Sequence, residues 1–489
     1  MPFDAFTEDR LRESPLLRKR VSEIMTPLPV TCRANTPLTD VAHLMAENRI
    51  SSVIVVDEAG RPVGLVTEKD LVHRVLTRPS WQAESLTAEM IMDDNLISVK
   101  VGDFYNQALL AMVRHQVKHL LVMEGETLAG ILTLRDLLKT RSTGSLWVTD
   151  KIETARNLDE LAIIGREVDS FLSALEVERA TVPELFEIIT ELHDRLTCRV
   201  IDFCLQEMEN KGYGPPPSEF CWINMGSAGR REQTLRTDQD NAIIHADEGG
   251  EGEKYFSILG PMVVEGLVRT GFARCRGGIM ASNAQWRRSL GQWKKDIEIR
   301  ANRADPGDTG TLSTFLDFRP VYGSFALARE LWKYVLELFA KPVRAAHYLA
   351  DEESRIRVPL TIWGGFATER SGPQKNGINM KQACRHIINC VRLFAVKNGI
   401  SETSTLERIK CIKDKGIFSE EDAELISNAF EIMMMLRMRE NRKKIRQGRE
   451  ADNYINPYQL RRFEQSLFKD ALSAAAHLQK LARGRFVIY

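Results

Sequence analysis

Several features are scarce or missing in this 489-residue sequence. No uncharged apolar run approaches the roughly 20 residues that cross a bilayer. The first residues carry acids and form no apolar leader. The charge is balanced, with 67 basic and 67 acidic residues, which argues against a protein that mainly coats nucleic acid or an anionic membrane. We therefore expect a cytoplasmic protein, and at roughly 100–200 residues per domain the length predicts about three domains.

Cysteine is present without any pairing pattern. The eight cysteines form no C-x-x-C pair, and no Cys/His cluster has zinc-like spacing. This pattern favours scattered buried thiols in a reducing compartment.

The first third of the chain contains an internal repeat. Met25, Val30, Met45 and Ile50 recur 67 residues later, and the segment 64–70 recurs as 130–136. Each copy predicts helix, strand, strand, helix. Two copies are too few for a solenoid, so a paired module is expected.

Each copy has a threonine three residues before an aspartate that opens a helix: Thr67 and Asp70, then Thr133 and Asp136. This spacing is a capping signature, although the carboxylate could instead accept ribose hydroxyls while the threonine and helix amides meet a phosphate. The repeat, residues 21–142, resembles the paired cystathionine-β-synthase (CBS) domain, with G-h-h-[ST]-x-x-D intact in both copies. The resemblance implies a cleft for adenine nucleotides (AMP, ADP or ATP) and a homodimer formed through these modules.

Residues 143–218 predict a helical connector, with apolar residues at spacings of three and four. The pair His193-Asp194 invites a metal-phosphohydrolase interpretation. It lies in a helical run without a companion ligand at metal spacing, so an ordinary helical role is favoured. A Gly/Pro-rich segment at 212–217 marks the next boundary.

Residues 219–345 carry the chemistry. A buried strand leads into Gly226-Ser227, and Asp238 and Asp240 precede a second apolar strand. Alternation places both carboxylates on one face, where they repel each other unless a cation lies between them. Oxygen ligands of this kind suit Mg²⁺ that also holds phosphate oxygens, and the small Gly-Ser turn lets backbone amides approach a triphosphate.

The order strand, Gly-Ser, ten residues, D-x-D, strand resembles the DNA polymerase β superfamily. The finer strings G-S-x-G-R-x-E and T-D-x-D-N resemble P-II uridylyltransferases and glutamine-synthetase adenylyltransferases. That resemblance implies a third carboxylate on a later strand, for which Asp296 and Asp317 are candidates in strand-like segments. We assign Asp317, with Arg319 beside it for phosphate charge. Arg230 is assigned to the phosphates or to an ion pair with Glu232.

The implied site residues fall into two groups. Two Mg²⁺ ions would be held by Asp238, Asp240 and Asp317, and the phosphates of UTP or ATP by Gly226, Ser227, Arg230 and Arg319. An acceptor hydroxyl on a protein or small molecule would attack the α-phosphorus, and pyrophosphate would leave. A non-catalytic nucleotide sensor and an RNA nucleotidyltransferase remain as alternatives, although the neutral net charge makes a nucleic-acid partner less expected.

Residues 346–489 predict a helical bundle, with a basic stretch at 437–449 that is either solvated, paired or phosphate-binding. The whole chain resembles bacterial signal-transduction proteins with a CBS pair, a nucleotidyltransferase domain and a C-terminal helical substrate-binding domain. The strings at 226–241, 316–323, 400–408 and 452–457 carry this resemblance. One departure is Asn379-Met380-Lys381, where the family usually has Asp-Leu-Lys.

The expected fold is α/β plus α, in five segments. These are an N-terminal segment (1–20), an α+β CBS pair (21–142), the connector (143–218), a polymerase-β-type nucleotidyltransferase domain (219–345) and the helical substrate-binding domain (346–489).

Overall fold

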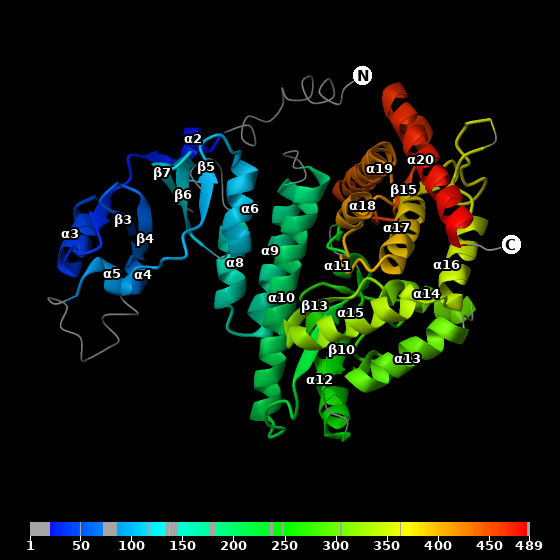
Figure 1. The fold of residues 1–489 in the computed structure, drawn as a ribbon, viewed down its shortest axis with the longest axis horizontal. Coiled ribbons are helices and arrows are strands. Elements are labelled where there is room, and N and C mark those ends of the chain that lie inside the picture. The colour runs from blue at the N-terminus through cyan, green and yellow to red at the C-terminus, as the bar shows by residue number, and fades with distance from the viewer. Residues whose placement is uncertain are drawn as a thin grey trace. The chain divides into compact units, whose positions relative to one another are not determined.

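The computed structural model describes residues 20–48, 50–71, 86–115, 117–133, 136, 145–175, 181–234, 238–246, 249–303, 306–361 and 363–486. The chain divides into two compact units, one ending at Lys151 and the other beginning at Ile152. Figure 1 shows short strands and helices in the first unit and mainly helices in the second. Within the described residues, no helix combines the length and apolar character that a membrane crossing needs.

The first unit contains two small sheets that repeat one pattern. In each copy two strands pair in parallel and the second of them forms an antiparallel hairpin with the next strand. The sheets are β2-β3-β4 and β1-β7-β6-β5. Their strands are β1 (Thr26–Pro27), β2 (Thr31–Arg33), β3 (Ser52–Val56), β4 (Pro62–Thr67), β5 (Ser98–Lys100), β6 (His119–Glu124) and β7 (Thr127–Thr133).

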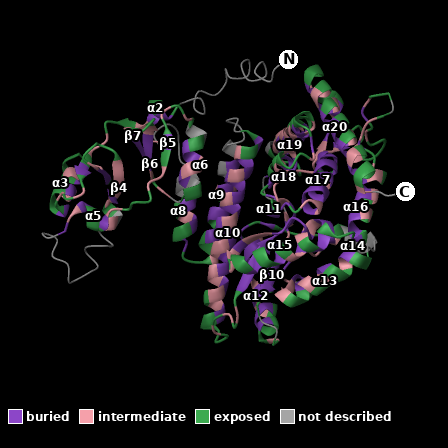
Figure 2. Cartoon of the chain, in the orientation of Figure 1, coloured by how far each residue is buried: buried purple, intermediate pink, exposed green. Residues whose placement is uncertain are grey.

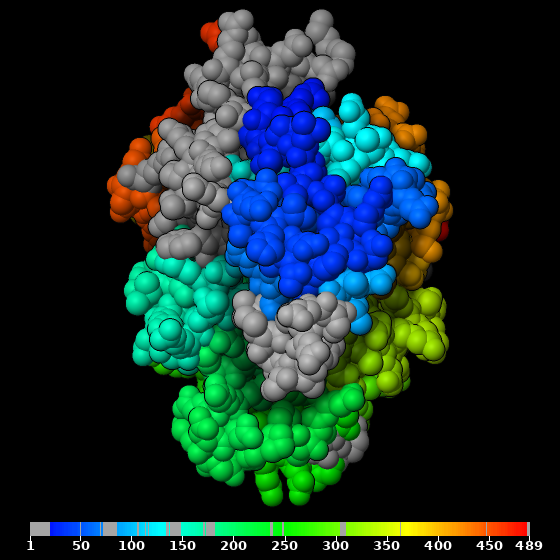
Figure 3. All heavy atoms as spheres, turned by 90° about the vertical axis from the view of Figure 1, so that its left-hand side faces the viewer, coloured from blue at the N-terminus to red at the C-terminus, as the bar shows by residue number. Residues whose placement is uncertain are grey.

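Helices join and flank these strands: α2 (Val21–Ile24), α3 (Leu38–Asn48), α4 (Glu68–Asp70), α5 (Ala88–Ile91) and α6 (Tyr105–His115). The first copy has the predicted order helix, strand, strand, helix (α3, β3, β4, α4), and the second copy repeats it as far as β7 within the described residues. Apolar side chains of both hairpins meet in one shared cluster, which includes Ile54 and Leu121. In the space-filling view, the dark-blue atoms of the first copy adjoin lighter-blue atoms of the second (Figure 3).

The two copies cover each other through a reciprocal methionine–glycine contact. A Cβ atom on Gly64 would lie 2.2 Å from the Met92 sulfur, and one on Gly130 would lie 2.7 Å from the Met25 sulfur. Met25 and Met92 are equivalent positions of the repeat, and each packs on the glycine of the other copy. Glycine is therefore required at both hairpins, because any side chain would displace the partner's methionine.

Three helices lead into the second unit: α8 (Ser145–Thr154), α9 (Leu158–Leu175) and α10 (Val182–Asn210). Thr181 and Glu184 form a capping box at the start of α10, which satisfies N–H groups that the first turn leaves open. The apolar stripe of α10 is buried and packs on α9 and on α12 (Glu251–Arg269). The described part of the predicted connector is thus mainly helical, and its helices α9 and α10 belong to the second unit.

A four-stranded sheet forms the centre of the second unit, in the order β12-β10-β8-β13. β8 (Phe220–Asn224) runs antiparallel to β10 (Asn241–His245) and to β13 (Arg319–Gly323), while β12 (Arg287–Ser289) runs parallel to β10. Every residue of β8 and β10 is buried, and Figure 2 shows β10 within buried surroundings. The flanking elements are α11 (Gly226–Gly229), β9 (Asp238–Gln239), β11 (Ala273–Arg274), η4 (Ala284–Trp286), α13 (Leu290–Arg303), α14 (Pro306–Phe315) and α15 (Phe325–Ala340).

Two strand expectations in this region are wrong. Asp296 lies in α13, where it pairs with Arg300 one turn later at 2.8 Å. Asp317 lies in the turn after α14, and the strand begins only at Arg319. In both segments apolar residues alternate over a few positions, and such short runs do not separate a helix or turn from a strand.

The remaining chain forms the predicted helical bundle. α17 (Met380–Lys397) is its central helix and packs against α16 (Arg344–Arg355), α18 (Thr405–Asp414), α19 (Glu420–Arg446) and α20 (Arg462–Phe486). Short strands β14 (Ile378–Asn379) and β15 (Tyr454–Ile455) pair beside it, and η5 (Pro457–Gln459) precedes α20.

Candidate active site

The Gly226-Ser227 turn lies directly against Asp240. Gly226 has φ +56°, and a Cβ atom there would come within 2.6 Å of the Asp240 Oδ2 atom. Both facts require glycine, since other residues rarely adopt this backbone conformation. Ser227 is partly exposed, and its carbonyl oxygen accepts a 2.9 Å hydrogen bond from the Glu232 N–H. The turn therefore packs its backbone directly against the Asp240 carboxylate and carries a partly exposed serine next to it in sequence.

Asp238 and Asp240 form an acidic pair at the edge of the sheet. Asp238 lies in β9 and Asp240 immediately precedes β10. Burial raises the pKa of Asp240 to about 6, the thiol of Cys275 opposes this by donating a hydrogen bond, and the charge of Asp238 adds to it. A carboxylate with these surroundings is costly to keep charged. A divalent cation would remove that cost, so the pair fits an Mg²⁺ ion.

Two basic side chains from the helical bundle converge on the acidic pair. Lys381, in the first turn of α17, places its Nζ atom 3.9 Å from the Asp238 Oδ1 atom. Arg437 of α19 is partly buried, and this desolvation lowers its pKa while the charge of Asp238 acts in the opposite direction. The Arg437 Nε–H group donates to Asn453 at 2.8 Å. These cations could neutralise the phosphates of a bound triphosphate.

Sequence reasoning missed Lys381, although it singled out the segment that contains it. Asn379 accepts a hydrogen bond from the Gln382 N–H at 3.1 Å and so caps α17. Asparagine and aspartate are both good caps. The change from the usual Asp-Leu-Lys therefore preserves the helix start and the position of the lysine.

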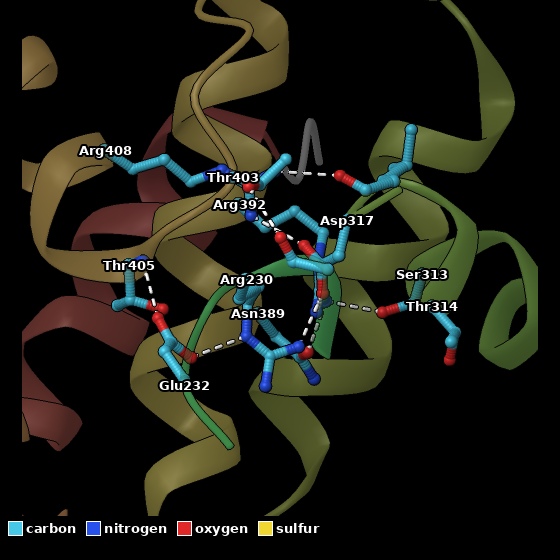
Figure 4. A network of polar contacts seen from close by, with 12 residues as sticks. Arg230, Glu232, Ser313, Thr314, Asp317, Asn389, Arg392, Thr403, Thr405 and Arg408 are labelled. Carbon is cyan, nitrogen blue, oxygen red and sulfur yellow. Dashed lines mark hydrogen bonds and ion pairs between the residues drawn. The ribbon is translucent and has the colours of Figure 1, made fainter. Parts of the chain in front are cut away.

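Asp317 is the most heavily paired carboxylate of the site (Figure 4). It is 0% exposed. Its Oδ1 atom accepts from Arg392 Nε at 2.8 Å and from Arg408 Nη1 at 2.7 Å. Its Oδ2 atom accepts from Arg230 Nη1 at 2.6 Å and also from Arg392 Nη2. Burial opposes ionisation, but the three guanidinium groups together hold its pKa well below the usual range.

The structure thus brings Asp238 and Asp240 together but gives Asp317 other partners. Both of its oxygens already accept two hydrogen bonds each, which uses the acceptor capacity of a carboxylate. Among the residues that the structure describes, no group of three or more His, Cys, Asp or Glu side chains is placed to hold a metal.

Arg230 connects Asp317 and its arginines to the segment that follows the Gly226-Ser227 turn. Besides its bond to Asp317, its Nε atom donates to Glu232 at 2.7 Å. The other Glu232 oxygen accepts from the Thr405 N–H at 2.6 Å. Arg230 was assigned either to the phosphates or to an ion pair with Glu232, and the structure contains the ion pair. We call Arg230, Glu232, Asp317, Arg392 and Arg408 the arginine–carboxylate cluster.

Arg319 is held by the long helix α10. Its guanidinium group lies 2.8 Å from Asp194 and donates to the Ala228 carbonyl oxygen at 3.1 Å. His193 is buried, with its Nδ1 atom 3.2 Å from the Gln233 side chain. The His193-Asp194 pair is therefore part of a helix that supports the turn, as expected for an ordinary helical role.

The basic stretch at the end of α19 is largely paired with its neighbours. Lys444 contacts Asp452 and donates to the Tyr454 carbonyl oxygen at 2.5 Å. Arg439 pairs with Glu464 of α20.

In the first unit, Thr67 and Asp70 form a capping box at α4, and Thr133 makes the same two hydrogen bonds to the Asp136 carboxylate. The Thr67 hydroxyl donates to Asp70 at 2.6 Å, and the Thr133 hydroxyl donates to Asp136 at the same distance. His119 is partly buried, and this desolvation lowers its pKa, while the charges of Asp136 and Asp70 act in the opposite direction. The two motifs consequently face one shared region around His119.

Three family models match this sequence. The CBS domain matches residues 21–77 and 88–142. The family described as "Putative nucleotidyltransferase DUF294" matches residues 166–307, and the family described as "Putative nucleotidyltransferase substrate binding domain" matches residues 344–486.

Similar curated proteins cover only part of this chain. An uncharacterized protein of Methanocaldococcus jannaschii is 30% identical over 24% of this chain and 31% of its own length. An inosine-5′-monophosphate dehydrogenase of Mycobacterium leprae is 28% identical over 37% of this chain and 33% of its own. The chain thus spans about a third of the length of these relatives.

Solved structures match a quarter of the chain. A conserved protein from Pyrococcus horikoshii is 29% identical over 26% of this chain and 96% of its own, with a TM-score of 0.24. A CBS pair solved with 5′-methylthioadenosine and S-adenosyl-L-methionine is 22% identical over 25% of this chain and 94% of its own, with a TM-score of 0.23.

Proposed function

We propose a function from the premise that this chain belongs to the CBS-domain proteins that carry a nucleotidyltransferase domain and its C-terminal substrate-binding domain. Its second unit would transfer a nucleoside monophosphate from a nucleoside triphosphate to a hydroxyl group. The observation that carries this proposal is the acidic pair Asp238/Asp240 seated against the Gly226-Ser227 turn.

The acidic pair would hold Mg²⁺, which characteristically binds through one or two carboxylates together with substrate phosphates. When bound, the ion would supply charge stabilisation for the transferring phosphoryl group. Because Asp317 is saturated by arginines, we restrict the proposed ligands to Asp238 and Asp240. Asp317 then becomes a residue that positions the turn through Arg230.

The chain's own groups would orient the triphosphate. Amides of the Gly226-Ser227 turn and the Ser227 hydroxyl would contact the phosphates, and Lys381 and Arg437 would offset their charge. The acceptor oxygen forms a bond to the α-phosphorus, the bond from this phosphorus to the bridging oxygen breaks, pyrophosphate leaves, and the hydroxyl proton passes to water. We keep UTP and ATP as the candidate donors and a regulatory protein as the acceptor, in the manner of P-II uridylyltransferases.

The CBS pair would regulate this transfer. Thr67, Asp70, Thr133 and Asp136 would bind AMP, ADP or ATP, and the modules would form a homodimer. Asp70 and Asp136 both exert their charge on His119, which supports one shared nucleotide region. If Asp70→Ala and Asp136→Ala both leave the affinity for adenine nucleotides unchanged in calorimetry, these residues serve only as helix caps.

Incubation with each α-labelled triphosphate, Mg²⁺ and cell extract tests the transferase directly. We expect label on an acceptor with the native chain, at least a 100-fold loss with Asp240→Asn, and full labelling with the control Asp470→Asn. Asp470 is an exposed carboxylate of α20 and receives the same change. Transfer that survives Asp240→Asn would remove that carboxylate from the mechanism, and label in the nucleic-acid fraction would indicate an RNA acceptor.

A second candidate is a sensor that binds nucleotide without turnover. It is favoured by the contact of Lys381 with Asp238 and by the missing third acidic ligand among the described residues. Tight triphosphate binding without a labelled acceptor in any extract would support this candidate.

A further inference from the structure

A cavity of about 880 Å³ opens in the second unit, separate from the acidic pair. One wall is the exposed face of α15. The others are Arg231, which follows α11, and the segment from Gly399 to Ser404 together with the first turn of α18. Neither Asp238 nor Asp240 nor Ser227 lines it. This volume is in the range of sites for small organic ligands.

Basic side chains dominate one part of the lining. Arg329 and Lys333 lie one turn apart on α15 and are exposed, and within the described part of the chain neither forms an ion pair. Arg231 lines the facing wall with φ +59°. Such a conformation is costly for arginine, and strained residues of this kind gather at ligand-binding sites. An anionic group between these walls would meet charge from both sides.

The floor of the cavity is apolar. Phe318, Pro320, Trp332 and Leu336 line it. The Trp332 indole N–H donates a 2.9 Å hydrogen bond to the Phe318 carbonyl oxygen, and the centroids of the two stacked rings are 4.6 Å apart. Phe318 is 0% exposed and Trp332 7%, so the surface that a ligand can reach comes mainly from the partly exposed Pro320 and Leu336. This surface is apolar and offers no donor, which suits a ring better than a free inorganic anion.

Acidic side chains complete the lining. Glu337 is on α15, and Glu402 and Glu407 are on the opposite wall. Carboxylates accept hydrogen bonds from sugar hydroxyls or ring amines, and they disfavour a ligand that is only a polyanion. We propose that this cavity binds a nucleoside phosphate, with its phosphate between Arg231, Arg329 and Lys333 and its sugar and base over the apolar floor.

Occupancy of the cavity would act on the catalytic turn. The Thr403 hydroxyl donates to the Gly229 carbonyl oxygen at 2.8 Å, and the Thr405 N–H donates to Glu232 (Figure 4). Arg408, which holds Asp317, also donates to the Glu402 carbonyl oxygen at 2.6 Å. A ligand that orders the 399–404 segment therefore contacts the same groups that fix the Gly226-Ser227 turn, and this site is a regulatory nucleotide site distinct from the CBS pair.

The test measures binding without metal and without triphosphate, so it does not depend on transfer activity. The full-length chain in EDTA is titrated with AMP, UMP and inorganic phosphate by calorimetry. Arg329→Glu/Lys333→Glu reverses two exposed charges, and Lys295→Glu is the matched control on an exposed helix position outside the cavity. In the Arg329→Glu/Lys333→Glu variant, the dissociation constant of at least one nucleotide-binding site should rise about tenfold or more. The native chain and Lys295→Glu should bind alike.

The same event should persist in Asp70→Ala/Asp136→Ala and in Asp240→Asn, because those changes lie at other sites. Inorganic phosphate should bind at least about tenfold more weakly than UMP, since it cannot use the apolar floor. Equal isotherms for the native chain and Arg329→Glu/Lys333→Glu overturn the proposal, and so does equal affinity for inorganic phosphate.

Amide hydrogen exchange on the native chain provides a second measurement that needs no variant. Saturating UMP should slow exchange in residues 399–404 and in the turn at 226–232. Unchanged exchange in both segments at saturating UMP contradicts the site.

Discussion

Replacing Asp317 by asparagine distinguishes a metal ligand from a structural carboxylate. Asparagine keeps the shape of the side chain but removes the charge that three buried arginines share. Its NH₂ group also replaces an oxygen that accepts two hydrogen bonds. Arg392 and Arg408 are 5% and 0% exposed, so water cannot solvate the positive charge that remains.

The expected loss is large for a single substitution. Removing one partner of a buried ion pair costs about 3–5 kcal/mol, against a total stability of roughly 5–15 kcal/mol for a typical domain. Asp317→Asn should therefore lower the free energy of unfolding by about 3–5 kcal/mol at pH 7. The arginines hold the pKa of Asp317 in the folded chain well below its ordinary value. The stabilisation that the Asp317 charge provides is therefore fully present when the pH is above the ordinary pKa. It is lost as the pH falls through the lower pKa of the folded chain.

The assay is urea unfolding of the full-length chain, followed by tryptophan fluorescence. Several tryptophans lie in the core of the second unit, including Trp222, Trp286 and Trp293. Asp240→Asn is the matched variant, since it makes the same change at the acidic pair. If Asp317→Asn unfolds within about 0.5 kcal/mol of the native chain but loses transfer, Asp317 acts in chemistry and the structural reasoning is refuted.

Three further outcomes are expected. Burial raises the pKa of Asp240 to about 6, so its charge destabilises the metal-free fold as pH rises through about 4–6. Asp240→Asn should then raise the free energy of unfolding by about 1–3 kcal/mol at pH 7.5 and by little at pH 4.5, and equal gains at both values would contradict this. Lys381→Met should weaken triphosphate binding about tenfold in calorimetry with the melting temperature unchanged, whereas an unchanged affinity would place Lys381 outside the site. Gly229→Ala should lower the free energy of unfolding by about 2–4 kcal/mol, because its Cβ atom would lie 2.0 Å from the Asp317 carbonyl oxygen. The control is Gly310→Ala, whose Cβ atom would meet nothing within 4 Å. This control should leave the stability unchanged or raise it in the same unfolding experiment.

The repeat could be predicted from sequence because it depends on local patterns. Strand runs, hairpin turns and the threonine cap at Thr67 are set by residues only a few positions apart. The reciprocal contact of Met25 and Met92 with the glycines of the opposite copy could not be predicted, although both methionines were visible as repeat positions. Their partners depend on how the two copies pack.

The acidic pair was predictable for a similar reason. Asp238, Asp240 and the Gly226-Ser227 turn lie within 15 positions of one another, and the spacing itself carries the chemistry. Asp317 was assigned as a metal ligand from the sequence, and its arginine partners were not predicted. Two of these partners lie 75 and 91 positions downstream and the third, Arg230, lies 87 positions upstream. No sequence spacing indicates which of many basic residues will be buried beside it.

Lys381 and Asp194 illustrate the same limit. Each was noticed for another reason, one inside a departure from the family pattern and the other inside a dipeptide typical of phosphohydrolases. Their contacts with Asp238 and Arg319 depend on helix packing between distant segments of the chain.

The arginine–carboxylate cluster also has a consequence for the order in which the chain can fold during synthesis. Asp317 leaves the ribosome 75 residues before Arg392 and 91 residues before Arg408. At about 5–20 residues per second, the carboxylate waits roughly 5–20 s for its last partner. A nascent chain that ends before residue 392 carries the whole acidic pair, yet its Asp317 has only Arg230 as a cluster partner, and Arg230 is shared with Glu232. The contacts that hold the Gly226-Ser227 turn in place consequently form only after much of the bundle has been synthesised. A prematurely terminated chain would therefore lack part of the support of the proposed nucleotide site.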